Sequence, residues 1–220
     1  GMIISGTRGA ISVPLAGFML FFILRKNIRV LSIGVAILAV VFIFFKFTMI
    51  GQGNDQIRRM RTAFDPNDAS LQVRLDNQRL LKRYLASRPF GGGIGHGGVK
   101  AQKYLPNAFL SQIATDSWYV LVWVEMGIIG LLMHLFILFY TLIRGTWLVM
   151  FRLKDPKLKL KISALIAGLA GVMVASYGNA VLGAMPTGML NYTSMAIILN
   201  AKALDKNNHE PVPVPIKKQY

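Results

Sequence analysis

The sequence predicts an all-α, polytopic helical membrane protein with about five transmembrane helices and a helical extracytoplasmic loop. Of its 220 residues, 54% are hydrophobic and 15% are charged, whereas soluble domains carry about 25% charged residues. The apolar residues gather into runs close to the roughly 20 residues that a helix needs to cross a bilayer. The two-residue alternation of membrane β-strands is absent from these runs.

Five apolar runs are candidate spans. The first is short and contains Pro14, which we expect to kink it. A basic loop at 25–29 separates it from the second run, and a Met185-Pro186 break separates the last two. The expected spans are 9–24, 30–50, 117–143, 162–183 and 187–201.

The loops predict one membrane domain over residues 1–201, with an extracytoplasmic loop at 51–116. Short cytoplasmic loops collect Lys and Arg, so the basic loops at 25–29 and 144–161 mark the cytoplasmic side. The proline-rich end, EPVPVPIKKQY, has too few apolar residues to build a core. We therefore expect residues 202–220 to form a disordered cytoplasmic tail.

The charge and the cysteine count exclude several classes of function. The formal net charge is +16, and the topology explains it, because the basic residues do not gather on one soluble face as in a nucleic-acid binder. We expect no nucleic-acid partner. The sequence contains no cysteine, which excludes disulfides and thiolate metal sites.

The outer loop contains an amphipathic helix, predicted from the capping residues Asn67 and Asp68 to Pro89. Four leucines line one face of this helix: Leu71, Leu75, Leu81 and Leu85. Arg74 falls within that apolar stripe. A charge there needs a partner, which is either a bound ligand, a lipid headgroup, or one of the carboxylates of Asp76 and Asp116.

A glycine-rich stretch, GGGIGHGG at 91–98, follows this helix. A nucleotide-binding loop would need a strand before it, whereas a helix precedes this one. We expect a backbone turn that lies close against the ends of the spans. His96 within the stretch is a weak candidate for acid–base chemistry, since a histidine can titrate near neutral pH.

Two acids accompany the third span. Asp116 stands where the helix should begin, so it is expected to cap the helix and to offer a carboxylate that can accept a proton from a sugar hydroxyl. Glu125 lies roughly 13 Å further along a regular helix. An acid inside a span usually faces protein or water. We expect Glu125 to be a buried polar tie between helices, paired with His134, Asn179 or a group on a missing span.

Three segments in order resemble the conserved region of the O-antigen ligase and polymerase family. They are SGTRG at 5–9, VRLDNQRLLKRYLASRPFGGGIGHG at 73–97 and DSWYVLVWVEMGIIGLL at 116–132. The resemblance extends over about residues 5–140. Family members have more spans, so the chain resembles a C-terminal portion, and the missing N-terminal membrane half is a further expected partner.

The resemblance implies a multi-pass glycosyltransferase of the bacterial cytoplasmic (inner) membrane, with its active side facing the periplasm. Such an enzyme moves a glycan from a polyprenyl diphosphate to a hydroxyl on lipid A–core or on another glycan, without a metal or cofactor. By the same resemblance, Arg8 and Arg74 bind the diphosphate, because guanidinium groups donate bidentately to phosphate oxygens.

The sequence departs from the family pattern at the acid–base position. Asp116 stands where the family's ligases have a histidine, so Asp116 is the candidate base and His96 the weaker alternative. Two other functions remain open on the sequence. One is a truncated, non-catalytic membrane partner, and the other is a transporter-like protein that uses Arg8, Glu125 and His134 along a pathway.

Overall fold

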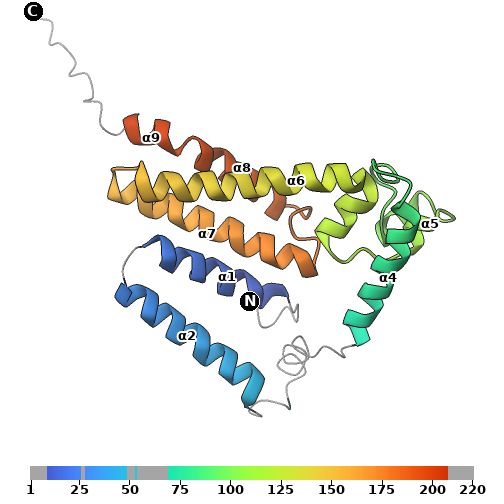
Figure 1. Ribbon diagram of the computed structural model, residues 1–220, viewed down its shortest axis with the longest axis horizontal. Helices are drawn as coiled ribbons and strands as arrows, with labels where there is room; N and C mark the ends of the chain where they lie inside the picture. The colour runs from blue at the N-terminus through green and yellow to red at the C-terminus, as the bar shows by residue number, and fades with distance from the viewer. Residues whose placement is uncertain (1–8, 26–27, 49–52, 54–68, 208–220) are drawn as a thin grey trace, which may run out of the picture.

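The computed structural model describes residues 9–25, 28–48, 53 and 69–207 (Figure 1). Every regular element in these ranges is a helix, which confirms the all-α class. The elements are α1 (Gly9–Leu24), α2 (Ile28–Phe47), α4 (Ala69–Leu85), the 3-10 helix η1 (Val99–Lys103), α5 (Phe109–Gln112), α6 (Trp118–Phe151), α7 (Pro156–Gly178), α8 (Thr187–Leu199) and α9 (Ala201–Asn207).

Each of the five expected spans overlaps a helix, namely α1, α2, α6, α7 and α8, with bounds that differ by several residues for α6 and α7. Within the described part of the chain, α6 and α7 are the two that are long and apolar enough to cross a membrane. Two shorter apolar segments, Val13–Leu24 and Ser32–Phe44, belong to α1 and α2. The described part of the chain thus has two candidate membrane-spanning helices, and the expected number of about five remains a prediction.

Helix α7 lies at the centre of the helix bundle, between α1 on one side and α6 and α8 on the other (Figure 1). Small residues let α1 and α7 come close: Gly17 faces the Ala167 carbonyl, and Gly171 faces the Val13 carbonyl. The buried core joins Leu138 and Leu148 of α6 to residues of α7 and α8. Further members of this core are Ile162, Ile166, Leu169, Met195 and Ile198.

Helix α6 is broken at Gly127, which has φ 69° and ψ −170°. Only glycine occupies this backbone region readily. Trp118 Nε1 donates a hydrogen bond to His134 Nε2 at 3.0 Å, although the two residues are 16 apart in sequence. A straight helix would separate them by about 24 Å. The chain therefore folds back at Gly127, and the predicted continuous span 117–143 is wrong. We call residues 118–126 the short arm and residues 128–151 the long arm.

The glycine-rich stretch holds this break together. Gly92 N–H donates to the Val124 carbonyl at 2.8 Å, and Gly93 N–H donates to the Glu125 carbonyl at 3.0 Å. Ile129 N–H donates to the Pro89 carbonyl at 3.4 Å instead of continuing the helix. The loop thereby satisfies backbone groups that the break leaves without helical partners. The expected close backbone turn is present, but it packs against the break within α6 and not against the ends of the spans.

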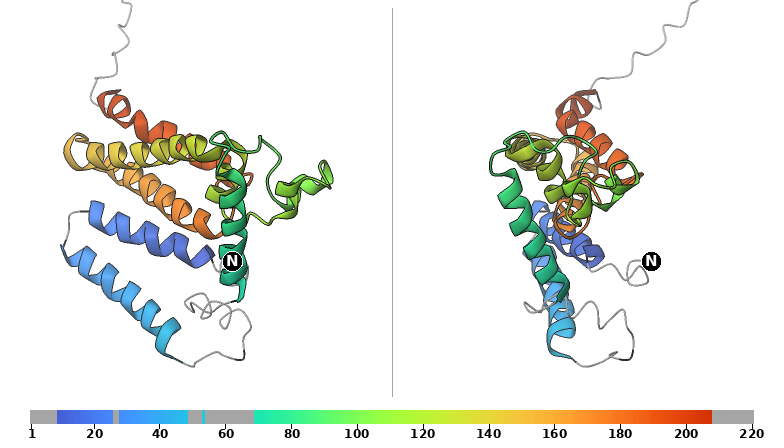
Figure 2. Two further views of the ribbon diagram at one scale, coloured as in Figure 1. Left: turned by 45° about the vertical axis from the view of Figure 1, so that its right-hand side comes forward. Right: turned by 90° about the vertical axis from the view of Figure 1, so that its right-hand side faces the viewer.

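Helix α4 runs across the end of the helix bundle (Figure 2). Its buried Leu81 and Leu85 pack against Leu110, Ile113 and Val124, so a second small core joins α4, α5 and the short arm. Leu71 at the other end of the leucine stripe is 37% exposed. The C-terminal half of α4 is thus anchored by burial, and the half that carries Arg74 is more open.

The chain after residue 201 is partly helical, in contrast to the expected disordered tail. The buried Asp205 of α9 accepts hydrogen bonds from the backbone N–H groups of Lys154 and Asp155, both at 3.0 Å. These bonds tie α9 to the turn between α6 and α7, and the prediction is wrong for residues 202–207. Residues 208–220 lie outside the described part of the chain.

Candidate active site

An ion pair joins two residues that are 42 positions apart. Arg74 Nε of α4 donates to Asp116 Oδ2 at 3.0 Å. The two side chains are 35% and 49% exposed. Asn77, one turn further along α4, donates from Nδ2 to the Ala114 carbonyl at 3.4 Å. Of the two carboxylates open to Arg74 on the sequence, Asp116 is its partner, and Asp76 pairs with Arg79 at 2.8 Å.

Asp116 does not cap α6, contrary to the expectation. The N-cap residue is Ser117, whose side chain makes no capping hydrogen bond. Its hydroxyl donates instead to the Ser176 carbonyl of α7, at 3.3 Å. The N-terminus of the short arm is thus fixed by α7, and the Asp116 carboxylate faces Arg74.

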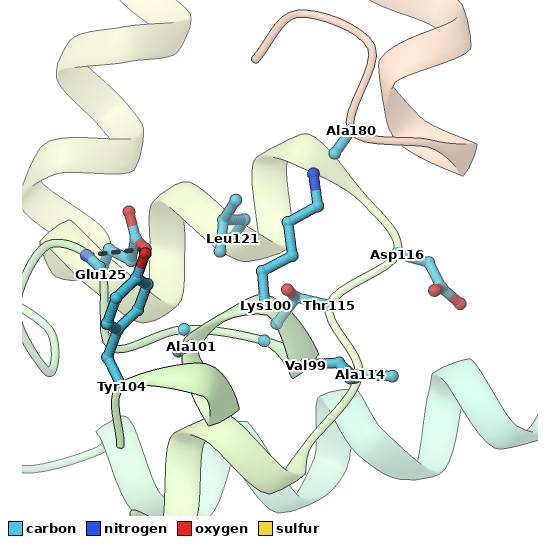
Figure 3. A pocket seen from close by; sticks show the side chains of 13 residues that line it. Val99, Lys100, Ala101, Tyr104, Ala114, Thr115, Asp116, Leu121, Glu125 and Ala180 are labelled. Carbon is cyan, nitrogen blue, oxygen red and sulfur yellow. Dashed lines mark hydrogen bonds between the residues drawn. The ribbon is translucent and has the colours of Figure 1, made fainter. Parts of the chain in front are cut away.

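Asp116 borders two hollows in the surface. The smaller one, of about 40 Å³, lies toward α4 and includes Arg74, Gln78 and Tyr177 in its wall. The larger one, of about 460 Å³, lies toward the glycine-rich stretch and includes Lys100 and Tyr104 (Figure 3). Arg74 belongs to the wall of the smaller hollow alone.

Glu125 belongs to the wall of the larger hollow (Figure 3). Its Oε1 accepts a hydrogen bond from the Gly95 N–H at 2.9 Å. The side chain therefore joins the glycine-rich stretch to the short arm. Glu125 is half-buried, and its bond goes to the Gly95 backbone and not to His134 or Asn179 as expected.

The remaining candidates lie elsewhere. His96 is exposed on the glycine-rich stretch and belongs to the wall of neither hollow. Arg8 lies outside the described residues. Within the described ranges, no group of three or more His, Asp or Glu side chains is arranged to hold a metal ion.

Sequence reasoning missed Lys100 and Tyr104. Figure 3 shows the Lys100 side chain extended across the larger hollow toward Ala180. Tyr104 is 75% exposed and lies on the Glu125 side of Lys100, opposite Asp116. Both residues come from η1 and its end, where a short turn has no periodic pattern. The one pattern that could have found them is their position directly after the glycine-rich stretch.

These features define a class of protein: a helical membrane protein with a guanidinium–carboxylate pair beside a cavity at a broken helix. The O-antigen ligase family model matches residues 1–135, and the chain belongs to this family. The match confirms the resemblance seen in the sequence and indicates a glycosyltransferase-like membrane enzyme acting on lipid-linked glycans. No curated protein and no solved structure matches the chain.

Proposed function

We propose that the chain carries the catalytic site of an enzyme that moves a glycan from a polyprenyl diphosphate to an acceptor hydroxyl on the periplasmic side of the cytoplasmic membrane. The observation that supports this reaction most strongly is the ion pair between Arg74 and Asp116. It brings an anion-binding group and a proton acceptor together, and family membership supplies the reaction class.

Arg74 would bind the diphosphate. Its bond to Asp116 uses only Nε–H, and the guanidinium group has five N–H donors in a planar fork. The four Nη hydrogens can therefore donate to phosphate oxygens while Nε stays on the carboxylate. As the glycosidic bond breaks, negative charge grows on the departing diphosphate, and a cation held in place stabilises that charge.

Asp116 would act as the base. The acceptor oxygen attacks the anomeric carbon, the bond from that carbon to the diphosphate oxygen breaks, and the hydroxyl proton passes to Asp116. The Arg74 bond occupies Oδ2, which leaves Oδ1 for the proton. Protonation neutralises Asp116 and frees the Arg74 charge for the diphosphate. Proton transfer and stabilisation of the leaving group are thereby linked through one ion pair.

Other parts of the proposal rest on the family resemblance. Arg8 would supply a second guanidinium group for the diphosphate, and His96 remains the weaker candidate for the base. The acceptor is lipid A–core in a ligase and another glycan in a polymerase. About five spans, with the stretch 51–116 on the periplasmic side, would place the site where this acceptor is available.

The test is Arg74→Ala in the intact protein, assayed in membranes supplied with polyprenyl-diphosphate-linked glycan and acceptor. We expect transfer to fall at least about 100-fold, which corresponds to about 2.7 kcal/mol of lost transition-state stabilisation, while membrane insertion is unchanged. Arg79→Ala is the matched control, because Arg79 lies on the same helix in an exposed ion pair with Asp76. Near-normal transfer by Arg74→Ala would refute the role in diphosphate binding.

A further inference from the structure

We propose that the larger hollow is the binding site for the terminal sugar of the acceptor, with Tyr104, Lys100 and Glu125 as its recognition residues. This inference rests on the proposed function, since it assigns the second substrate of the same reaction. It follows from the shape, the chemistry and the position of the hollow relative to the ion pair.

Size separates the two hollows. The smaller one, of about 40 Å³, offers little more than the roughly 30 Å³ that a water molecule occupies in the liquid. The larger one, of about 460 Å³, falls within the ~300–1,000 Å³ typical of sites for small molecules. A sugar ring therefore fits the larger hollow and does not fit the smaller one beside Arg74.

The chemistry of the larger hollow suits a polyol. Tyr104 exposes 75% of its surface, and Lys103 Nζ lies 5.5 Å from the centroid of its ring. The accessible part of the ring is apolar, and the C–H face of a sugar can pack against it. The Glu125 carboxylate accepts hydrogen bonds from hydroxyl groups, and the Lys100 ammonium donates them. One ammonium group beside two carboxylates, those of Glu125 and Asp116, does not make a site for a diphosphate.

The glycine-rich stretch forms one wall and fixes the geometry of these groups. Gly95 N–H holds Glu125 Oε1 at 2.9 Å, which orients the carboxylate before any ligand arrives. At Gly97 an added Cβ would lie 2.9 Å from Leu121 and 3.2 Å from Glu125, so the wall packs tightly on the short arm. Preorganised polar groups of this kind reduce the entropy lost when a ligand binds.

The position of the larger hollow places the acceptor and the donor on different sides of Asp116. Figure 3 shows Glu125 and Asp116 at opposite ends of the larger hollow, with Lys100 between them and the Asp116 carboxylate directed away from Lys100, at the rim. An acceptor that extends from Glu125 toward Asp116 presents its reacting hydroxyl at the Asp116 end. Arg74 pairs with Asp116 from the α4 side, so donor and acceptor approach the base from different directions.

The experiment measures acceptor binding without transfer. Purified full-length protein in detergent is titrated separately with two soluble probes, the delipidated lipid A–core oligosaccharide and the free repeat-unit oligosaccharide, and saturation-transfer NMR reports binding. We expect one probe to bind, and its identity distinguishes a ligase from a polymerase. Tyr104→Ala should weaken that binding at least tenfold and Lys100→Ala several-fold.

Matched variants separate sugar recognition from damage to the fold. Tyr104→Phe keeps the ring and should retain binding within about twofold, and so should Gln102→Ala, an exposed position of η1 outside the hollow. In the transfer assay, Tyr104→Ala should raise the KM for the acceptor and leave the KM for the donor unchanged. Binding of neither probe, or equal binding by Tyr104→Ala and the wild type, would overturn the assignment.

Transfer and probe binding in Arg74→Ala distinguish the acceptor site from the diphosphate site. Arg74→Ala should lower transfer at least about 100-fold and still bind the acceptor probe normally, because Arg74 is outside the larger hollow. Loss of probe binding in Arg74→Ala would contradict the separation of the two sites. Normal transfer by Arg74→Ala together with normal probe binding would refute the proposed function alone.

Discussion

Exchanging the charges of Arg74 and Asp116 separates a structural ion pair from a catalytic one. If the pair only attaches α4 to the segment before α6, the double variant Arg74→Asp/Asp116→Arg restores it with the opposite polarity. If Arg74 binds a diphosphate and Asp116 takes a proton, the double variant puts a carboxylate where the phosphate must bind. The geometry favours this test, because one hydrogen bond of 3.0 Å connects the two side chains.

The two roles differ clearly in expected magnitude. The side chains are 35% and 49% exposed, and an ion pair in such a setting contributes about 0–1 kcal/mol to stability. Each single variant should therefore lower the unfolding temperature only slightly. A charge-assisted hydrogen bond contributes about 1.5–3 kcal/mol, so the loss of two of them to a diphosphate costs about 3–6 kcal/mol. That energy corresponds to a decrease in the transfer rate of about 100-fold to 10⁴-fold.

The assay compares four proteins: the wild type, Arg74→Asp, Asp116→Arg and the double variant. Transfer of labelled glycan is measured in membranes, and thermal unfolding is measured in detergent. We expect the double variant to regain stability and to remain at least 100-fold impaired in transfer. Recovery of transfer to within tenfold of the wild type would show that the pair is only structural and would refute the catalytic assignment.

Three further predictions concern the elements that position the site. Gly127→Ala should destabilise the protein by about 1–3 kcal/mol, because the backbone at residue 127 lies in a region reserved for glycine, and an added carbon would overlap the Pro89 carbonyl. Thermal unfolding measures this, and Gly168→Ala, which meets no atom within 4 Å, should be neutral or stabilising. Glu125→Gln should retain the hydrogen bond from Gly95 and most of the transfer activity. Glu125→Ala should lose this bond and increase hydrogen exchange at residues 91–98. Equal exchange in the two variants would contradict the role of Glu125 in holding the glycine-rich stretch. Asp205→Ala should expose residues 201–207 to proteolysis, because two backbone N–H groups lose their acceptor, and unchanged cleavage would exclude that anchoring role.

The sequence predicted the parts of the fold that depend on local pattern. Apolar runs of membrane length gave the positions of five helices, and the leucine stripe gave α4 with Arg74 on its apolar face. The glycine-rich stretch follows a helix and not a strand, which excludes a nucleotide-binding loop and predicts the close backbone turn that the structure has. Each of these inferences uses neighbours in the sequence, which local propensity and periodicity describe well.

The break in α6 depends on contacts that no local pattern contains. Gly127 stands in an apolar run, and glycine is common in transmembrane helices, so nothing in the run marks it as a break. The partners that stabilise the break, Pro89, Gly92 and Gly93, come from the loop before it. For the same reason the sequence predicts a helix cap at Asp116, whereas the partner of its carboxylate is Arg74, 42 residues away.

The break at Gly127 is also what forms the candidate site. In a straight helix, Asp116 would lie about 16 Å beyond Gly127 along the axis, away from the end of the bundle. The fold-back instead returns the start of the short arm to the level of His134 and of Ser176 on α7. Asp116 then meets Arg74 on one side and borders the larger hollow on the other. The short arm is attached to the glycine-rich stretch by the bonds from Gly92 and Gly93.

Gly127→Ala should therefore reduce transfer by more than its loss of stability explains, even at temperatures where the variant is fully folded. If transfer by the folded variant equals that of the wild type, the fold-back does not position Asp116 for catalysis.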